Sequence, residues 1–293
     1  MKLAIKIDVD TLRGTEQGVP RMAEILRKRK AGATFLFSLG PDHTGRAVRR
    51  AFRPGFFSKV QRTSVLKHYG LRTLLYGTLL PGPDIGKRTR ATLRAVRAEG
   101  FETGIHCWDH VRWQDFVAQR DAAWTEREMT RAVERYREIF REKAHVWGAA
   151  GWQTNRHAAW FQERTFAYAS DTRGTHAFRP LWNGVQIGCP QLPTTLPTFD
   201  ELLGLEPDPV QRLLDLTAAA KKDHVFTAHA ELEGGRFAPL FDLLVEGWQA
   251  QGYEVVALIE LYQSLDPAAL PRHEVVYGEV PGRSGTLALQ GGT

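Results

Sequence analysis

The sequence of 293 residues has only two cysteines, Cys107 and Cys189, and no long run of apolar residues. Two cysteines are too few for a disulfide framework, which excludes the small disulfide-rich secreted class. No uncharged stretch approaches the ~20 apolar residues of a membrane-spanning helix. Lys6 and Asp8 interrupt the first apolar segment, so that segment does not resemble a signal peptide. These absences predict a cytoplasmic protein.

Acidic residues are absent from residues 43–83, a stretch that contains eight lysines and arginines. The whole chain has a net charge of +6, so this segment alone makes it basic. Phenylalanines accompany the arginines. A basic, aromatic segment without acids suits an anionic surface, either membrane headgroups or nucleic acid, although a solvated basic face has the same composition. The predicted docking residues are Arg49, Arg50, Arg53, Phe56, Phe57 and Arg62.

Hydrophobic residues make up 43% of the chain and charged residues 25%, which is the balance of a globular protein with a large core and excludes a disordered or fibrous chain. Short strand-like segments alternate with helical ones, which predicts an α/β fold with a parallel sheet. No G-x-G-x-x-G motif follows the first strand, where a dinucleotide-binding sheet would need it. We therefore predict a closed or nearly closed barrel formed by residues 1–293 as one domain, with an insertion at about residues 43–83. The predicted strands are residues 3–9, 33–39, 101–107, 145–149, 166–170, 185–189, 224–228 and 253–257. The predicted helices include residues 19–30, 85–99, 126–143, 156–164, 208–222 and 239–251.

Titratable side chains follow alternate predicted strands, at the end of a barrel where enzymes place their chemistry. The first strand runs into Asp8 and Asp10, the third ends at His106 with His110 shortly after it, and the seventh runs into His229. Two acids on one face of a strand are costly to bury without a partner, and a divalent cation would offset that cost. Asp10, His106 and His110 would supply one oxygen and two nitrogens and leave positions open for water, as in a catalytic metal site.

The remaining polar side chains at this end allow two interpretations each. Asp8 can accept the proton of an attacking water, and His229 can protonate a leaving amine or stabilise an oxyanion. His229 can equally be a core histidine bonded to a backbone carbonyl. Asp171 and Arg173 follow the fifth strand, where they form either part of a substrate site or a structural salt bridge.

Several segments match a known family when they are taken together. They are IDVDTLRGTEQGVPR, FSLGPDHTGR, GIHCWDHVRWQ, AAGWQTN, SDTRG-x-x-x-FRP, QLPTTLPTFDE, TAHAELEG and the tail GEVPGRSG. Over nearly the whole chain this combination resembles the polysaccharide deacetylase (NodB-homology) family, and within it the 4-deoxy-4-formamido-L-arabinose-phosphoundecaprenol deformylases. The resemblance implies a distorted (β/α) barrel that binds one divalent metal ion, zinc in the first instance, with cobalt or manganese as alternatives.

The resemblance also implies roles for individual residues. Asp8 matches the general base and His229 the general acid, while Asp10, His106 and His110 match the metal ligands. The Arg-Pro-Pro segment that many superfamily members have after the fourth strand is replaced here by GAAGW at residues 148–152. Arg173 is therefore expected to contact the base from the next strand end. The further substrate-binding or base-orienting candidates are Asp171 and Trp152.

The function implied by the resemblance is hydrolysis of the formamide of a sugar linked through phosphate to undecaprenol, for lipid A modification. The implied partners are that lipid-linked sugar and the anionic inner-membrane surface, reached from the cytoplasmic side by residues 43–83, with no nucleic acid. The alternative enzyme is an N-deacetylase of another amino sugar or of a cell-wall polysaccharide. A third possibility is a binding module that has kept the barrel without its catalysis.

Overall fold

The computed structural model of the chain describes residues 1–47 and 70–292. The predicted docking residues Arg49, Arg50, Arg53, Phe56, Phe57 and Arg62 lie outside the described residues.

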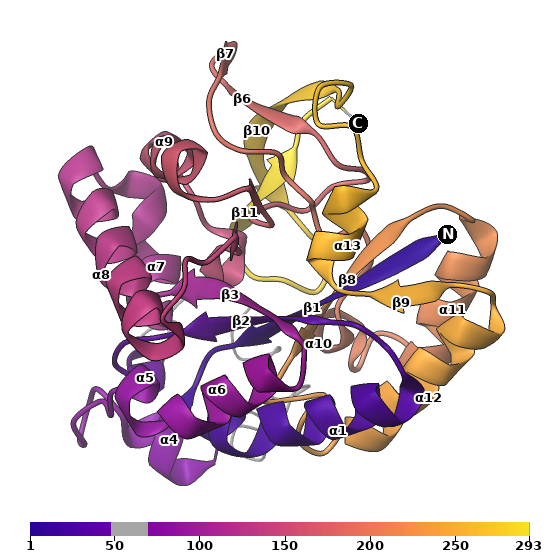
Figure 1. Ribbon diagram of the computed structural model, residues 1–293, viewed down its shortest axis with the longest axis horizontal. Helices are drawn as coiled ribbons and strands as arrows, with labels where there is room; N and C mark the ends of the chain where they lie inside the picture. The colour runs from indigo at the N-terminus through magenta and orange to yellow at the C-terminus, as the bar shows by residue number, and fades with distance from the viewer. Residues whose placement is uncertain (48–69, 293) are drawn as a thin grey trace.

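The main sheet of the described chain has seven strands, and all of their pairings are parallel. Its order is β5-β4-β3-β2-β1-β8, and β9 also pairs with β1 (Figure 1). The α/β class and its parallel sheet are therefore confirmed. The strands are β1 (Lys2–Val9), β2 (Thr34–Ser38), β3 (Glu102–Cys107), β4 (Val146–Trp147), β5 (Tyr168–Ala169), β8 (His224–His229) and β9 (Glu254–Val256).

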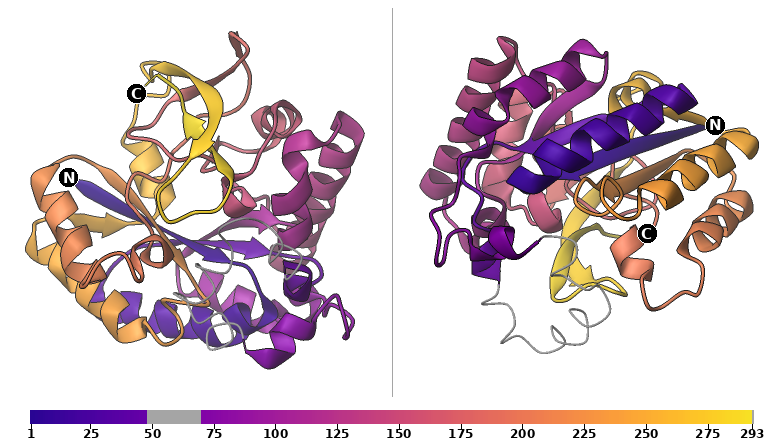
Figure 2. Two further views of the ribbon diagram at one scale, coloured as in Figure 1. Left: turned by 180° about the vertical axis from the view of Figure 1, so that it is seen from behind. Right: turned by 90° about the horizontal axis from the view of Figure 1, so that it is seen from below.

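Helices α1, α6 and α12 run side by side along one face of this sheet (Figures 1 and 2). The predicted helix at residues 85–99 is interrupted at Thr89, whose backbone φ of −107° and ψ of 15° leave the helical region, so two helices form instead.

No helix within the described ranges is long and apolar enough to cross a bilayer. The helical elements are η1 (Gly14–Gly18), α1 (Val19–Arg29), α4 (Leu71–Leu75), α5 (Ile85–Arg88), α6 (Arg90–Ala98), α7 (His110–Phe116), η3 (Val117–Gln119), α8 (Ala122–Phe140), η4 (Ala150–Trp152), α9 (Arg156–Thr165), α10 (Phe199–Leu202), α11 (Pro209–Ala219), α12 (Ala238–Ala250) and α13 (Leu258–Gln263).

A second sheet lies over the opposite face of the main sheet, and it corrects one predicted strand. Residues 185–189 do not join the barrel, because β7 (Val185–Gln186) forms an antiparallel hairpin with β6 (Arg179–Trp182). The hairpin belongs to a four-stranded sheet of order β11-β10-β6-β7, completed by β10 (Arg272–Glu279) and β11 (Thr286–Gln290). Residues 185–189 therefore lie outside the barrel, and the chain rejoins it only at the next segment.

The return segment, residues 190–195, closes the gap between β5 and β8 where a sixth barrel strand was predicted. The amide of Ala169 donates to the Pro190 carbonyl at 2.9 Å, and the amide of Leu192 donates back to Ala169 at 2.8 Å. On the other side, the amide of Thr195 donates to the carbonyl of Val225 in β8 at 3.0 Å. The main sheet is thus a curled half-barrel whose open side is bridged by an extended segment.

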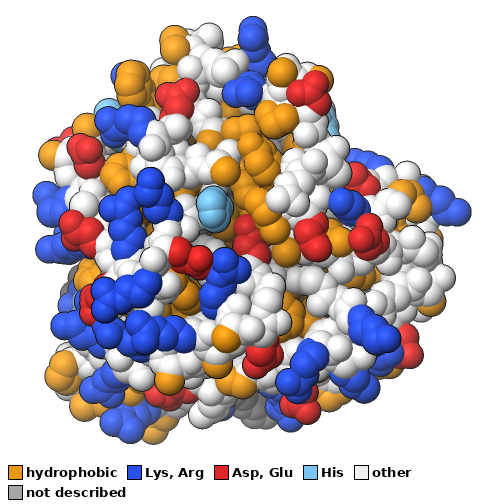
Figure 3. Space-filling model, in the orientation of Figure 1, with side chains coloured by type: hydrophobic (Ala, Val, Ile, Leu, Met, Phe, Trp, Pro, Cys, Tyr) orange, Lys and Arg blue, Asp and Glu red, His pale blue; other side chains and the backbone are white. Residues whose placement is uncertain are grey.

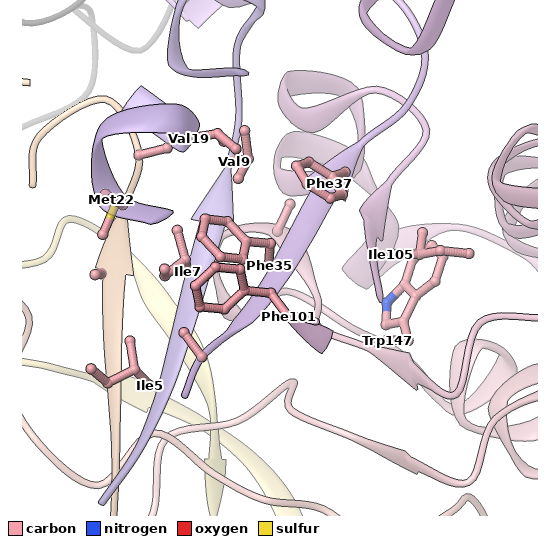
Figure 4. Close-up of a cluster of buried hydrophobic side chains, with 14 of the residues drawn as sticks. Ile5, Ile7, Val9, Val19, Met22, Phe35, Phe37, Phe101, Ile105 and Trp147 are labelled. Carbon is pink, nitrogen blue, oxygen red and sulfur yellow. The ribbon is translucent and has the colours of Figure 1, made fainter. Parts of the chain in front are cut away.

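Strand β1 shows how the sequence divides the interior into two environments. Ile5, Ile7 and Val9 point to the helical side, where they pack with residues such as Phe35 and Met22 (Figure 4). Each such side chain stabilises the fold by about 1.5–3 kcal/mol when it is removed from water. Because successive residues of a strand face opposite sides, the alternate residues of β1 face the inside of the half-barrel, and they include charged side chains.

Candidate active site

Asp10, His106 and His110 come together at the carboxyl ends of β1 and β3. Each offers one ligand atom, and these atoms all lie within 4.8 Å of one another. The Nε2 atoms of His106 and His110 are 3.3 Å and 3.4 Å from Oδ1 of Asp10. His106 is the penultimate residue of β3, and His110 is the first residue of α7, so the turn between strand and helix brings both rings to Asp10.

These three residues fit a divalent cation. Oδ1 of Asp10 is buried and accepts no hydrogen bond, which is costly for a carboxylate unless a cation binds it. Nδ1 of His106 donates to the carbonyl oxygen of Gly148 at 2.7 Å, so Nε2, which lies 3.3 Å from Asp10, is the nitrogen available to a metal. A histidine that ligates a metal commonly has its other nitrogen held in this way. One oxygen and two nitrogens is a donor set that zinc, cobalt and manganese accept.

The electrostatics of the site favour a charged carboxylate at Asp10. Burial acts to raise the pKa of Asp10, but the neighbouring His110, His106 and His229 outweigh it and hold the pKa well below its usual range. Burial disfavours the charged form of His106, yet Asp8 and Asp10 raise its pKa overall. A cation bound at Nε2 of His106 would therefore compete with the proton that these two carboxylates favour.

Glu231 fixes the position of the loop that carries Asp10. Its Oε1 accepts hydrogen bonds from the amides of Asp10 (3.1 Å) and Thr11 (2.9 Å) and from the Thr11 hydroxyl (2.8 Å). Glu231 is buried, and it approaches the chain so closely that a Cβ on Gly14 would lie 2.0 Å from Oε1. Glu231 thus acts as a structural partner of the ligand loop.

Asp8 lies next to this cluster, and its charge partner is Lys6. Nζ of Lys6 is 3.4 Å from Oδ2 of Asp8 and donates to the carbonyl of Ser170 at 3.2 Å, and both charged side chains are almost completely buried. Oδ1 of Asp8 accepts no hydrogen bond and lies 3.7 Å from Nδ1 of His106. Asp8 therefore keeps one oxygen available for a proton beside the candidate metal position.

His229 ends β8 and faces the cluster from the other side. Its Nδ1 lies 4.0 Å from Oδ1 of Asp200, and its backbone amide donates to Glu233 at 2.9 Å. Burial raises the pKa of Glu233 to about 8, so this carboxyl is largely protonated at neutral pH. The ring of Trp152 meets the His229 ring edge to face, with centroids 6.4 Å apart.

Trp152 is the centre of a cationic cluster. The charged groups of Lys6, Arg173 and Arg283 lie 5.2, 5.1 and 4.7 Å from its ring. The indole Nε1 donates to Oγ1 of Thr194 at 3.1 Å, in the segment that bridges the open side of the half-barrel. Cations over an aromatic face are attracted by its quadrupole, so this ring holds several basic side chains at the rim of the site.

Asp171 and Arg173 have structural partners. Asp171 is buried, its Oδ1 accepts from the amide of Ala149, and its Oδ2 accepts from Gln162 and Gln191. Burial raises the pKa of Asp171 to about 6. Nη1 of Arg173 pairs with Oε1 of Glu201 at 2.5 Å. The cation beside Asp8 is therefore Lys6, while Arg173 pairs with a carboxylate of α10.

Curated relatives match this chain over almost its full length. It is 35% identical over 294 aligned positions to the "Probable 4-deoxy-4-formamido-L-arabinose-phosphoundecaprenol deformylase ArnD" of Shewanella sediminis (strain HAW-EB3), covering 99% of this chain and 94% of the relative. A protein of the same name from Wigglesworthia glossinidia brevipalpis is 30% identical, with 94% and 98% covered. The chain belongs to the ArnD deformylase family. No family model matches the chain.

The fold of this ArnD family member is that of solved polysaccharide deacetylases. A crystal structure assigned as a polysaccharide deacetylase from Mycobacterium smegmatis superposes with a TM-score of 0.61 at 16% identity, covering 95% of each chain. A family 4 acetyl xylan esterase from Clostridium thermocellum, solved with a cobalt ion, gives a TM-score of 0.53 at 12% identity, covering 93% of this chain and 97% of that one. These similarities confirm the distorted barrel.

Sequence reasoning missed three members of the site: Lys6, Glu231 and Glu233. Lys6 is two residues before Asp8, so the alternation of β1 places both on the inner face, and a lysine there needs an anionic partner. Glu231 and Glu233 follow His229 at spacings of two and four. Their burial depends on the turn after β8, which the sequence pattern does not specify.

Proposed function

We propose that the protein is a metal-dependent amidohydrolase that deformylates 4-deoxy-4-formamido-L-arabinose-phosphoundecaprenol. The products are formate and 4-amino-4-deoxy-L-arabinose-phosphoundecaprenol, for lipid A modification. The observation that carries this proposal is the Asp10–His106–His110 cluster with Asp8 beside it, in a chain of the ArnD deformylase family. We propose further that residues 1–293 form one catalytic domain, and what supports this is the ion pair between Arg283, near β11, and Glu201 beside the site.

The mechanism assigns one proton step to each side of the cluster. Asp10, His106 and His110 would hold a divalent cation, which when bound polarises the amide carbonyl and lowers the pKa of water. Asp8 accepts a proton from the water whose oxygen bonds to the formyl carbon. Lys6 keeps Asp8 in place. His229 donates a proton to the nitrogen as the carbon–nitrogen bond breaks, so that formate and an amine leave.

The separate roles of Asp8 and Asp10 are tested by their asparagine variants. Asp8→Asn is expected to retain the metal but lose turnover by about 10²–10⁴-fold, the usual contribution of a general base. Asp10→Asn is expected to lose metal as well, because it removes one of three protein ligands. Bound metal after dialysis and formate release are measured for both. An empty site in Asp8→Asn with a full site in Asp10→Asn would reverse the assignment.

For the metal we propose zinc, with cobalt and manganese as functional substitutes. What supports this is the ligand set of one carboxylate and two imidazoles, with the remaining positions open. Elemental analysis of the purified protein should find about one zinc per chain, and chelation should abolish formate release until zinc is returned. Full activity of a protein stripped of all three metals would contradict the proposal.

We also propose that the protein works as a peripheral protein on the cytoplasmic face of the inner membrane, docked through residues 43–83. What supports this is the sequence of that segment, which has eight basic residues and no acid, and a substrate with a polyprenyl chain. Each basic residue near an anionic surface contributes about 1 kcal/mol, screened by salt. Replacing Arg49, Arg50, Arg53 and Arg62 together by Glu should release the protein from anionic liposomes, and unchanged binding would refute the docking role.

A further inference from the structure

A pocket of about 500 Å³ lies along the flank of α7, apart from the residues discussed so far. Its lining within the described chain combines three arginines, two aromatic rings and one acid. These residues are Arg46, Gly77, Val111, Arg112, Asp115, Phe116, Arg120 and Trp124. Cations outnumber carboxylates three to one in this set, so the pocket favours an anion.

Aromatic rings hold two of the three guanidinium groups. Arg120 lies over Phe116, 5.1 Å from its centroid, and 5.8 Å from the ring of Trp124. Arg112 lies 5.5 Å from the same Trp124 ring, and it also reaches Glu128 at 3.6 Å. A guanidinium that stacks on an aromatic face keeps its N–H groups, which lie in its own plane, free to bind an oxyanion.

Arg46 also lines the pocket. Its Nε donates to the carbonyl of Gly77 at 2.9 Å, which fixes the stem of the side chain. Gly77 has a φ of +79°, and a Cβ there would lie 3.1 Å from Nε of Arg46. A glycine at this position therefore leaves room for the Arg46 side chain. Among the described residues, neither Arg46 nor Arg120 has a carboxylate partner, so both keep an unneutralised charge.

The pocket lies near the start of α7, the helix whose first residue belongs to the candidate metal cluster. The helix begins at His110, and the next residues, Val111 and Arg112, already line the pocket. The ring of His43 lies 2.7 Å from a Cβ built on Gly77 of the lining, and its Nδ1 lies 2.6 Å from Oδ2 of Asp109, the residue that precedes the ligand His110. Figure 3 shows lysine and arginine side chains gathered on the left of this face, where α7 and α8 lie in Figure 1.

We propose that this arginine pocket binds the phosphodiester that joins the sugar to the polyprenyl chain of the substrate. The inference rests on the proposed function and adds to it a recognition site that the cluster itself does not supply. The formamide and the phosphate sit on opposite sides of one sugar ring, so the phosphate needs a binding site beside the metal cluster and separate from it. Arginine suits this role because its planar fork donates two parallel hydrogen bonds to a phosphate.

The test compares two substrates with the purified, metal-loaded full chain. One is a detergent-solubilised formamido sugar linked through phosphate to a short polyprenyl chain, and the other is the methyl glycoside of the same sugar. The measured quantity is the ratio of kcat/KM for the first over kcat/KM for the second. Arg46→Gln and Arg120→Gln should each lower this ratio roughly ten-fold or more, the contribution of a charge-assisted hydrogen bond.

Two further variants sharpen the result. Arg120→Lys keeps the charge but loses the planar fork, so it should lower the ratio by less than Arg120→Gln does. Arg137→Gln removes an exposed arginine of α8, outside the pocket lining, and should leave the ratio unchanged. Inorganic phosphate should inhibit wild type competitively, and the inhibition should weaken in Arg46→Gln and Arg120→Gln.

The outcomes separate this proposal from the proposed function. If wild type releases formate from neither substrate, the proposed function fails. If wild type deformylates the phosphate-linked substrate and the pocket variants keep the wild-type ratio, only the pocket proposal fails. If the variants lose activity solely when the substrate is presented in anionic vesicles, the pocket binds bulk lipid headgroups, and the substrate assignment is overturned.

Discussion

The side chains of Lys6 and Asp8 form a buried ion pair, and removing either partner leaves an uncompensated charge inside the protein. Lys6→Met is expected to reduce the free energy of unfolding by about 3–5 kcal/mol, because the charge of Asp8 then lacks its partner. The double variant Lys6→Met/Asp8→Asn removes both charges and should recover most of that loss. Denaturant unfolding of Lys6→Met, Asp8→Asn, the double variant and wild type measures this coupling.

Lys6→Arg provides the matched control, since it keeps the positive charge in a larger group. It should destabilise less than Lys6→Met. If the double variant is no more stable than Lys6→Met alone, the pair is not energetically coupled, and the position of Asp8 must depend on other contacts.

The Glu233 carboxyl predicts a pH effect on stability. Its pKa is about 8 in the folded protein because of burial, against about 4.3 in the unfolded chain. Between these values the folded state binds more protons, so the stability that Glu233 contributes is fully present at low pH and declines as the pH rises to about 8. Glu233→Gln keeps an acceptor for the His229 amide and removes this titration. Its free energy of unfolding should therefore fall less than that of wild type between about pH 5 and pH 9, and parallel curves would contradict the assignment.

At the scale of elements, the π-helical turn η1 and the start of α1 pack tightly against the turn after β8. A Cβ on Gly18 would lie 2.0 Å from the carbonyl oxygen of Ala230, the residue that follows His229. Gly18→Ala is therefore expected to cost about 1–3 kcal/mol through overpacking, and to lower formate release by displacing the His229 segment. Urea unfolding and turnover measure both effects. Glu24→Ala, at an exposed position of α1, should leave both near wild type.

The pattern of apolar residues was sufficient to predict the strands and helices that belong to the repeating strand–helix arrangement of the main sheet. The seven parallel strands and the α1 boundary follow from alternating apolar residues and from Pro20 at the first helical turn. The strand predicted at residues 185–189 failed because an apolar run does not reveal its partner, and this run pairs with β6 in another sheet. The segment at residues 190–195 contains two prolines and has no strand pattern, although its backbone bridges the half-barrel.

The candidate metal cluster was predictable for a related reason. Asp10 follows β1, while His106 lies at the end of β3 and His110 follows it. Both strands are neighbours of β2, so the topology alone brings the three residues to one edge. The contact between Lys6 and Asp8 could also be read from alternation. The supporting carboxylates Glu231 and Glu233 could not, because their hydrogen bonds depend on how the turn after β8 packs against η1.

For the whole molecule, metal binding and folding should be linked through the histidine ligands. The raised pKa of His106 means that the metal competes with protons, so bound metal should decrease as the pH falls from about 8 to about 5. A metal that binds only the folded state adds about 2.7 kcal/mol to the free energy of unfolding when its free concentration is 100 times its dissociation constant. Thermal unfolding with and without zinc, at both pH values, measures this. A zinc-independent Tm for a protein that binds zinc would contradict the linkage.

The position of β1 in the sheet determines when during its synthesis the protein can acquire its active form. β1 leaves the ribosome well before β8 and β9, with which it pairs, because their residues lie more than 200 positions later. The backbone edge of β1 that pairs with β8 and β9 therefore stays unpaired while most of the chain is translated, at roughly 5–20 residues per second. During that interval the nascent chain presents an open strand edge, which is a target for chaperones and a hazard for aggregation. Expression yield should therefore depend strongly on translation speed and chaperone supply, even for variants whose folded state is fully stable.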